Sequence, residues 1–306
     1  MLRNALLWAS TNPFLAERLP RYRFVRNATR RFMPGEGLED ALEAAQRLAL
    51  DGIRSTLTLL GENVSSADSA DGVLEHYETV LEAATANELD VEISVKPTQV
   101  GLDLSASDTH DRISRLVHAT ESTVWIDMEH SPHVDATLEI FRSLKQVRDN
   151  VGLCLQSYLR RTEKDLESLL PLEPSIRLVK GAYLEPPDVA FARKVDVDRN
   201  FVRLAGRLLR ARAAGGKGRP MLASHDARVI GEATRLAFEL GLHKSAYEIS
   251  LLYGVVPREQ MRLAREGYRV RVLVSYGSAW FPWYMRRLAE RPANLWFVAK
   301  QLLRGG

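Results

Sequence analysis

The segment Ile176-Arg-Leu-Val-Lys-Gly-Ala-Tyr183 combines a short apolar alternation with two cations, a glycine and an aromatic ring. Side chains alternate along a strand, so Ile176 and Leu178 would share one face and Arg177 and Val179 the other. An arginine inside a buried strand needs a partner, because an unpaired buried charge is very costly. The segment therefore predicts a strand whose Arg177 side chain faces other polar groups.

The C-terminal end of this segment has the chemistry of a binding site. Lys180, Gly181 and Tyr183 leave the strand together. They offer positive charge, an unhindered backbone and an aromatic plane, which suit an anionic cofactor that contains a ring.

Similar short apolar runs recur along the chain and alternate with helical patterns. The expected strands cover 55–60, 92–96, 123–127, 152–156, 176–180, 221–224, 245–249 and 269–274. Apolar residues at helical spacing predict helices over 67–87, 108–120, 134–149, 163–169, 187–214, 227–240, 257–266 and 284–303. Eight β/α repeats predict a (β/α)8 barrel, an α/β fold of the TIM type. We expect one domain over 1–306, with N-terminal helices in 1–50 and the barrel in 51–306.

The composition excludes several classes of protein. Apolar residues make up 45% of the 306 residues, charged residues 26%, and the formal net charge is +3. No basic run is interleaved with aromatics, so nucleic-acid binding is not indicated. The single cysteine, Cys154, excludes an intrachain disulfide and a cysteine-based zinc site. With no signal peptide or membrane-length apolar run, we expect a cytoplasmic protein.

Polar side chains gather where the expected strands end, and in such barrels the C-terminal face carries the active site. Alternation places Ser94 with Lys96, and Trp125 with Asp127, on the lumen side. The residues expected at this face are Glu62, Asn63, Lys96, Asp127, Glu129, Gln156, Tyr158, Arg177, Lys180, His225, Asp226, Glu248 and Tyr276.

Lys96 admits two interpretations. A desolvated lysine at a strand end could form a Schiff base with a carbonyl substrate. A salt bridge to Asp127, at the end of the next strand, is the interpretation that we favour. Asp127 and Glu129 with His130 and His133 could also bind a metal, but their spacing matches no recognised site, so we expect none.

His225 and the last helix each leave two interpretations open. His225 could be a general base, while Asp226 could cap a helix that begins near Ala227, a position that also suits a phosphate. Arg286 and Arg287 could be solvated, or could clamp a carboxylate with their planar guanidinium groups. No glycine-rich nucleotide motif occurs, so a nucleotide would be held some other way.

Seven motifs in this order make the chain, from about Ser94 to the C-terminus, resemble the proline dehydrogenase family. These flavoenzymes oxidise L-proline to Δ1-pyrroline-5-carboxylate. The motifs are Ser94-Val-Lys-Pro-Thr-Gln99 with Gly101-Leu102, Ile126-Asp-Met-Glu129, Gln156-Ser-Tyr158, Arg177-Leu-Val-Lys-Gly-Ala-Tyr183, Ala223-Ser-His225, Tyr247-Glu248 with Leu252-Tyr-Gly254, and Arg286-Arg287.

The resemblance implies a distorted barrel with a final helix over its mouth, and FAD bound without a Rossmann domain. Arg177 would lie near the flavin N5 edge and Gln156 against the isoalloxazine ring. The other cofactor contacts that it implies are Asp127, Met128, Val179, Lys180, Gly181, Ala182, Tyr183, Ser224, His225, Asp226 and Glu248. Arg286 and Arg287 would bind the proline carboxylate, over a polar floor of Lys96 and Asp127. Tyr276 and Tyr284 are expected beside the substrate, and Lys96, Asp127 and Arg177 are the expected catalytic residues.

Three positions depart from the family pattern. Leu273 and Trp283 stand where the family usually has tyrosines that line the proline site, and Ser250 stands where it usually has glutamine. The pocket should therefore differ in polarity and shape. The alternative function is a flavin-dependent dehydrogenase of another cyclic or N-substituted amino acid, such as hydroxyproline.

The resemblance also implies partners. Electrons would pass to a quinone, with peripheral contact at the inner face of the membrane through the aromatic last helix and the basic N-terminus. No aldehyde dehydrogenase domain fits this length, so a separate chain would oxidise pyrroline-5-carboxylate. Two other classes remain open: a lysine Schiff-base lyase that uses Lys96, and a barrel that binds ligands without catalysis.

Overall fold

Eight parallel strands close into a barrel in which each strand pairs with the next in the sequence and β8 pairs back to β1. The computed structural model describes residues 6, 8, 12–18, 29 and 31–290. The strands are β1 Arg54–Leu59, β2 Val91–Val95, β3 Val124–Ile126, β4 Val151–Gln156, β5 Ser175–Val179, β6 Pro220–Ala223, β7 Glu248–Leu252 and β8 Arg269–Tyr276. The predicted (β/α)8 barrel is confirmed.

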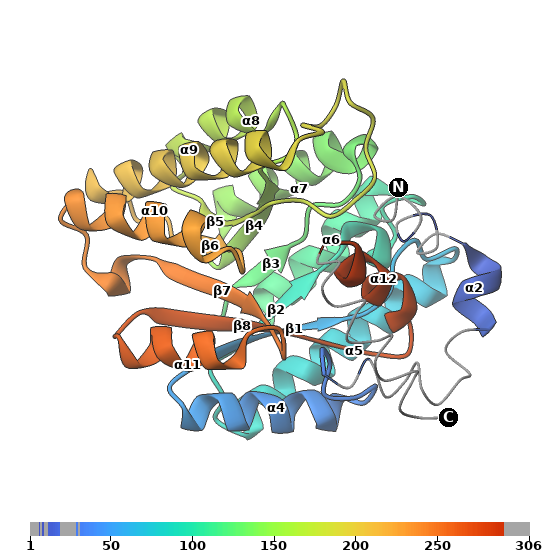
Figure 1. Ribbon diagram of the computed structural model, residues 1–306. Coiled ribbons are helices and arrows are strands. Elements are labelled where there is room, and N and C mark those ends of the chain that lie inside the picture. Colours follow the sequence, from blue (N-terminus) through green and yellow to red (C-terminus); the bar gives the residue numbers. More distant parts are fainter. Residues whose placement is uncertain (1–5, 7, 9–11, 19–28, 30, 291–306) are drawn as a thin grey trace, which may run out of the picture.

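Helices surround the strands, and α12 (dark red) lies on the side of the barrel where α2 lies (Figure 1). The α-helices are α2 Pro13–Arg18, α4 Leu38–Leu50, α5 Ala67–Ala86, α6 Ala106–His118, α7 Val134–Val147, α8 Thr162–Leu169, α9 Lys194–Ala213, α10 Ala227–Glu239, α11 Pro257–Arg265 and α12 Trp280–Glu290. Short 3-10 turns include η2 Pro97–Val100 and η5 Lys244–Ala246.

Helix α5 illustrates how local sequence fixes these elements. The Ser66 hydroxyl accepts a hydrogen bond from the Ser69 amide and so caps the first turn. The buried residues Leu74, Tyr77 and Leu81 recur at helical spacing on the face that packs on the barrel.

Three elements differ from their expected bounds by three residues or more. Strand β7 begins at Glu248, three residues later than predicted, because Ser245 belongs to the turn η5. Helix α9 begins only at Lys194, because the preceding loop forms a β-bridge between Ala190 and Leu159. Helix α12 begins at Trp280, and its first turn tolerates a proline. The rest of the predicted last helix lies outside the described residues.

The barrel has an apolar outer face and a polar lumen. Ile93, Val95 and Leu153 are buried on the outer face, as the alternation predicts. Arg177 of β5 contacts Ser94 of β2, and these strands are not neighbours, so both side chains cross the lumen. Here the mouth denotes the C-terminal ends of the strands.

Ion pairs fill the opposite, N-terminal end of the lumen. Arg271 Nε lies 2.9 Å from Glu248 and 3.3 Å from Glu92, and Arg219 lies 2.7 Å from Glu92. The expected place of Glu248 at the mouth is therefore wrong. Because Glu248 is the first residue of its strand, its carboxylate neutralises arginines at the far end of the lumen, so its assignment to the cofactor is withdrawn.

A second apolar cluster joins the two ends of the chain. Trp280, Phe281 and Trp283 of α12 are buried against residues that include Leu6 and Phe32. These aromatic side chains are therefore not available to a membrane surface, which corrects that expectation for α12. Within the described part of the chain, every helix is too short or too polar to span a membrane.

Candidate active site

Arg177, Asp127 and Ser94 meet in the centre of the lumen. The Arg177 guanidinium is ion-paired to Asp127 and donates from Nη2 to the Ser94 hydroxyl at 2.7 Å. The Ser94 hydroxyl in turn donates to Asp127 Oδ1 at 2.9 Å. Arg177 is only 3% exposed, so this arrangement supplies the partners that a buried guanidinium requires.

Lys96 follows β2 and forms the predicted salt bridge, with Nζ 3.4 Å from Asp127 Oδ2. Burial alone would lower the pKa of Lys96, but the carboxylates of Asp127 and Glu62 outweigh it and raise that pKa. Burial likewise opposes ionisation of Asp127, yet Arg177 and Lys96 hold its pKa below the usual range. The site is therefore a carboxylate between two permanent cations.

Glu129 holds the turn that follows Lys96. Its carboxylate accepts hydrogen bonds from the amide of Thr98 at 2.9 Å and from the Thr98 hydroxyl at 2.7 Å. Burial raises the pKa of Glu129 to about 7, against the effect of these two bonds. Thr98 lies in η2, so Glu129 fixes the backbone beside Lys96.

Arg286 of α12 spans the mouth. Its guanidinium donates to both oxygens of Glu62, which follows β1, at 2.6 and 3.2 Å. Its Cζ atom lies 5.2 Å from the ring centroid of Tyr183, which follows β5, and the Tyr183 hydroxyl donates to Glu62 at 3.2 Å. The last helix therefore does lie over the mouth.

The other residues expected at the substrate have different outcomes. Arg287 is half-buried, with Cζ 5.9 Å from the Trp283 ring, and Tyr284 packs on Phe32 in the second apolar cluster. Their substrate contacts stay predictions. Tyr276 is wrong for that role: its hydroxyl bonds to His76 of α5 at 2.8 Å, so its side chain points out of the barrel.

Gln156 and Gly181 lie together on the β4–β5 side of the mouth. Gln156 donates from Nε2 to the carbonyl of Met128 at 2.8 Å. Gly181 has a φ of +106°, and a Cβ atom there would lie 2.2 Å from the ring of Tyr158. Only glycine fits this position, because the ring of Tyr158 packs directly on its backbone. Val179, the last residue of β5, and Ala182, which follows Gly181, are both half-buried.

Lys180 is paired rather than free. Its ammonium lies 2.5 Å from Asp198 and 2.9 Å from Asp226, which also contacts Lys194. Asp226 precedes α10 as predicted but makes no capping hydrogen bond, because its side chain serves these lysines. Close by, the Ser224 hydroxyl accepts a hydrogen bond from the amide of Asp226, and His225 Nε2 accepts one from the amide of Leu252.

The sequence placed Glu62 and Glu129 at the mouth but gave neither a role, and it missed Glu185. The Glu185 carboxylate accepts hydrogen bonds from the amide of Ser131 at 2.8 Å and from its hydroxyl at 2.7 Å. The neighbouring His130 packs on Tyr183, with ring centroids 4.2 Å apart. Glu62, Glu129 and Glu185 each follow a strand, and this recurrence of acidic residues is the signal in the sequence that could have found their roles at the mouth.

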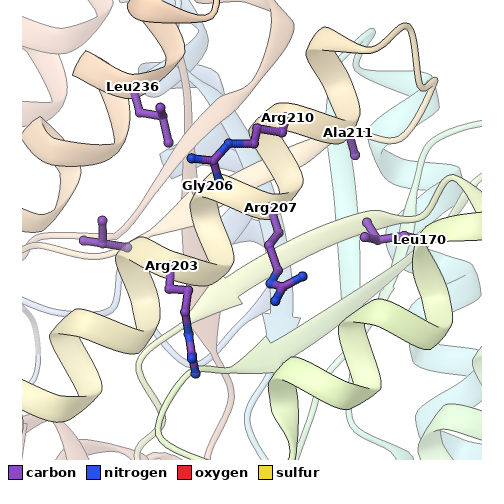
Figure 2. Close-up of a pocket in the computed structure, with 8 residues that line it drawn as sticks. Leu170, Arg203, Gly206, Arg207, Arg210, Ala211 and Leu236 are labelled. Atoms are coloured by element: carbon purple, nitrogen blue, oxygen red, sulfur yellow. The ribbon is translucent and has the colours of Figure 1, made fainter.

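A separate open groove lies on the outer surface. Figure 2 shows Arg203, Arg207 and Arg210 of α9 around Gly206, with Leu236 of α10 beside them. Arg203 and Arg207 are ion-paired to Glu163 of α8. This groove lies outside the barrel, and its charged rim is largely neutralised, so it is not the active site. Among the described residues, no group of three or more metal-ligating side chains converges.

The fold and the site define a (β/α)8 barrel with a buried cation–carboxylate centre beneath an arginine-bearing last helix. The chain matches the family model described as proline dehydrogenase over residues 41–300. It is 38% identical to proline dehydrogenase 1 of Bacillus subtilis subsp. natto, with 99% of this chain and 100% of the relative covered. It is also 38% identical to the proline dehydrogenase of Deinococcus radiodurans, with 100% and 99% covered.

The chain belongs to the proline dehydrogenase family and is an oxidoreductase. Among solved structures, proline utilization A from Bdellovibrio bacteriovorus superposes with a TM-score of 0.81 at 24% identity. That alignment covers 94% of this chain and 36% of the larger protein, and it supports the barrel fold alone.

Proposed function

We propose that this chain is an FAD-dependent proline dehydrogenase that converts L-proline to Δ1-pyrroline-5-carboxylate. The observation that carries the proposal is the full-length similarity to curated proline dehydrogenases, joined to a site whose cations suit a carboxylate substrate. Lys96 and Arg177 lie in the lumen, and Arg286 lies across the mouth above them.

Arg286 and Arg287 are the proposed carboxylate ligands. Arg286 already holds a carboxylate, that of Glu62, through two hydrogen bonds. Planar guanidinium groups suit such paired contacts, and bonds between two ions are stronger than neutral ones. A proline carboxylate would take the place of Glu62, and Tyr183 would form the wall beside the ring.

Two buried polar atoms support the proposal that the site binds a flavin. Arg177 Nη1 and Gln156 Oε1 are buried and have no hydrogen-bond partner among the described residues. One is a donor and one an acceptor, and the isoalloxazine ring offers both kinds of group along its edge. The residues present therefore fit the cofactor.

When bound, the flavin supplies the chemistry by accepting a hydride from C5 of proline. Loss of that hydride and of the amine proton leaves a C5=N double bond, which is the imine product. Arg177 and Lys96 stabilise the negative charge that develops nearby, because both are fixed in a buried site. Since its pKa is raised, Lys96 holds positive charge rather than accepting the amine proton.

Electrons would leave for a quinone, and a separate dehydrogenase would oxidise the product. Trp8 and Phe14 are each 60% exposed near the N-terminus. Exposed aromatic side chains of this kind support peripheral contact with a membrane surface, where quinones are found.

The test is an absorption spectrum of the purified protein before and after anaerobic L-proline. We expect flavin bands that bleach with L-proline and persist with D-proline, in which the carboxylate lies on the other side of the ring. A colourless protein that binds no added FAD would contradict the cofactor, and flavin that L-proline does not bleach would contradict the substrate.

A hydroxylated proline is the second candidate substrate. Leu273 shares the lumen face of β8 with Arg271 and pairs in register with Thr56. The hydroxyl of Ser275, two residues nearer the mouth, is buried with no partner among the described residues. It could bond to an extra hydroxyl on the substrate. Steady-state rates over a panel of cyclic amino acids decide this, and a clear preference for L-proline contradicts it.

A further inference from the structure

We propose that Trp125 is a positioning residue that supports Arg177 from the N-terminal side of the lumen. The inference rests on the proposed function, which assigns Arg177 to the flavin. It goes beyond that function because it explains how Arg177 is held in place.

The indole of Trp125 contacts two arginines. Its ring centroid is 5.3 Å from Cζ of Arg177 and 5.1 Å from Cζ of Arg219. Arg177 pairs in register with Met221, so Arg219 lies two residues nearer the N-terminal end of the lumen. Cations over the face of a tryptophan are attracted to it, most strongly when water is excluded. Trp125 is fully buried, so both contacts are of that kind.

Two neighbours fix the indole in turn. Its Nε1 donates to Glu92 at 2.6 Å, and Glu92 is held by Arg219 at 2.7 Å and by Arg271 at 3.3 Å. Gly152 pairs with Trp125 across β3 and β4, and a Cβ atom there would lie 2.5 Å from the ring. The glycine makes room for the indole, and the ion pairs at the N-terminal end of the lumen hold its edge.

Hydrogen bonds alone do not fix the direction of Arg177. Asp127 and Ser94 both hold the same atom, Nη2. The guanidinium could pivot about that atom. Nη1 has no hydrogen-bond partner among the described residues, and the contact of Arg177 with the nearby Cys154 thiol is weak because a thiol is a poor acceptor. The indole, with its ring 5.3 Å from Cζ, restricts this pivot and so holds the orientation of the guanidinium.

The test compares Trp125→Leu and Trp125→Phe with Phe141→Leu, a matched loss of a buried ring in α7, outside the lumen. In stopped-flow experiments with L-proline, Trp125→Leu should slow flavin reduction about tenfold, or about 1.4 kcal/mol, and change KM less than about threefold. Trp125→Phe keeps an aromatic face and should stay within about threefold of the wild-type rate. Among these three variants, crystal structures should show Arg177 displaced only in Trp125→Leu.

The inference would be overturned if the rate of flavin reduction in Trp125→Leu lies within about twofold of the rate in Phe141→Leu and Arg177 is not displaced. If Trp125→Leu does not fold, Gly152→Ala pushes the same ring with one methyl group. It should displace Arg177 and slow reduction, and an unchanged Arg177 there would also overturn the inference. If wild-type flavin is not reduced by L-proline, the proposed function fails, while the crystallographic position of Arg177 still tests the support by Trp125.

Discussion

Arg286 of the last helix and Glu62 after the first strand form a bidentate ion pair across the barrel mouth, with N–O distances of 2.6 and 3.2 Å. Both side chains are largely buried. The arginine proposed to bind the substrate carboxylate is thus already neutralised by a carboxylate of the protein. Substrate binding must exchange one partner of Arg286 for another.

Because of this exchange, we expect the removal of Arg286 and the removal of Glu62 to lower kcat/KM by different amounts. Arg286→Ala removes the substrate ligand itself and should lower kcat/KM for L-proline at least about hundredfold, or about 3 kcal/mol. Glu62→Ala removes the group that orients Arg286 but also the carboxylate that proline must displace, so it should lower kcat/KM by at most about tenfold. Steady-state kinetics measure both, and the exposed Arg235→Ala on α10 is the control. A larger loss for Glu62→Ala than for Arg286→Ala would contradict this order.

The lumen charges predict a strong effect on stability. Asp127→Asn leaves Arg177 and Lys96 buried without their shared carboxylate. Breaking a buried pair by removing one partner costs about 3–5 kcal/mol of unfolding free energy. Urea unfolding of the cofactor-free protein measures the loss. The matched control is Asp149→Asn, whose carboxylate pairs with Lys145 at the surface and should change stability by less than about 1 kcal/mol.

The strand and helix patterns sufficed to predict the barrel and the convergence of three charged residues in its lumen. Alternation put Arg177, Asp127 and Lys96 on one lumen face, and the structure joins all three. Strand β7 was misplaced by three residues because 245–249 and 248–252 alternate equally well. Glu248 decides between them, since its carboxylate meets Arg271 and Arg219 from distant segments. No local pattern contains that information.

The error at Tyr276 has a similar cause. The expected strand ended at residue 274, two residues before β8 ends. Strand alternation through residue 276 would have turned Tyr276 outward, where His76 of α5 binds it. The pairing of Arg286 with Glu62 could not be predicted, because it depends on how the last helix crosses the mouth.

The environment of Lys96 predicts that it forms no Schiff base. The nearby carboxylates of Asp127 and Glu62 keep its pKa raised despite burial, so the amine stays protonated at neutral pH. A protonated amine is not nucleophilic. Borohydride reduction with pyruvate or another small carbonyl compound should leave Lys96 unlabelled by mass spectrometry. Labelling at Lys96 that is absent from the Lys96→Arg variant would revive the lyase interpretation.

Glu129 predicts a stability that falls as the pH rises. Burial raises its pKa to about 7 in the folded protein, against 4.5 for the ordinary side chain. Between these values the folded state keeps a proton that the unfolded chain releases. Stability from this group is therefore complete below about pH 4.5 and lost toward pH 7, by at most about 3 kcal/mol.

The Glu129→Gln variant isolates this effect, because glutamine keeps an oxygen that can accept from Thr98 but does not titrate. Urea unfolding at pH 5, 6 and 7 should show the wild type losing stability relative to the variant at each step. The other carboxyl groups cancel in this difference, including Asp127, whose pKa is lowered. A wild-type-to-variant difference that stays constant with pH would mean that Glu129 is ionised throughout, with the Thr98 bonds and Lys96 outweighing its burial.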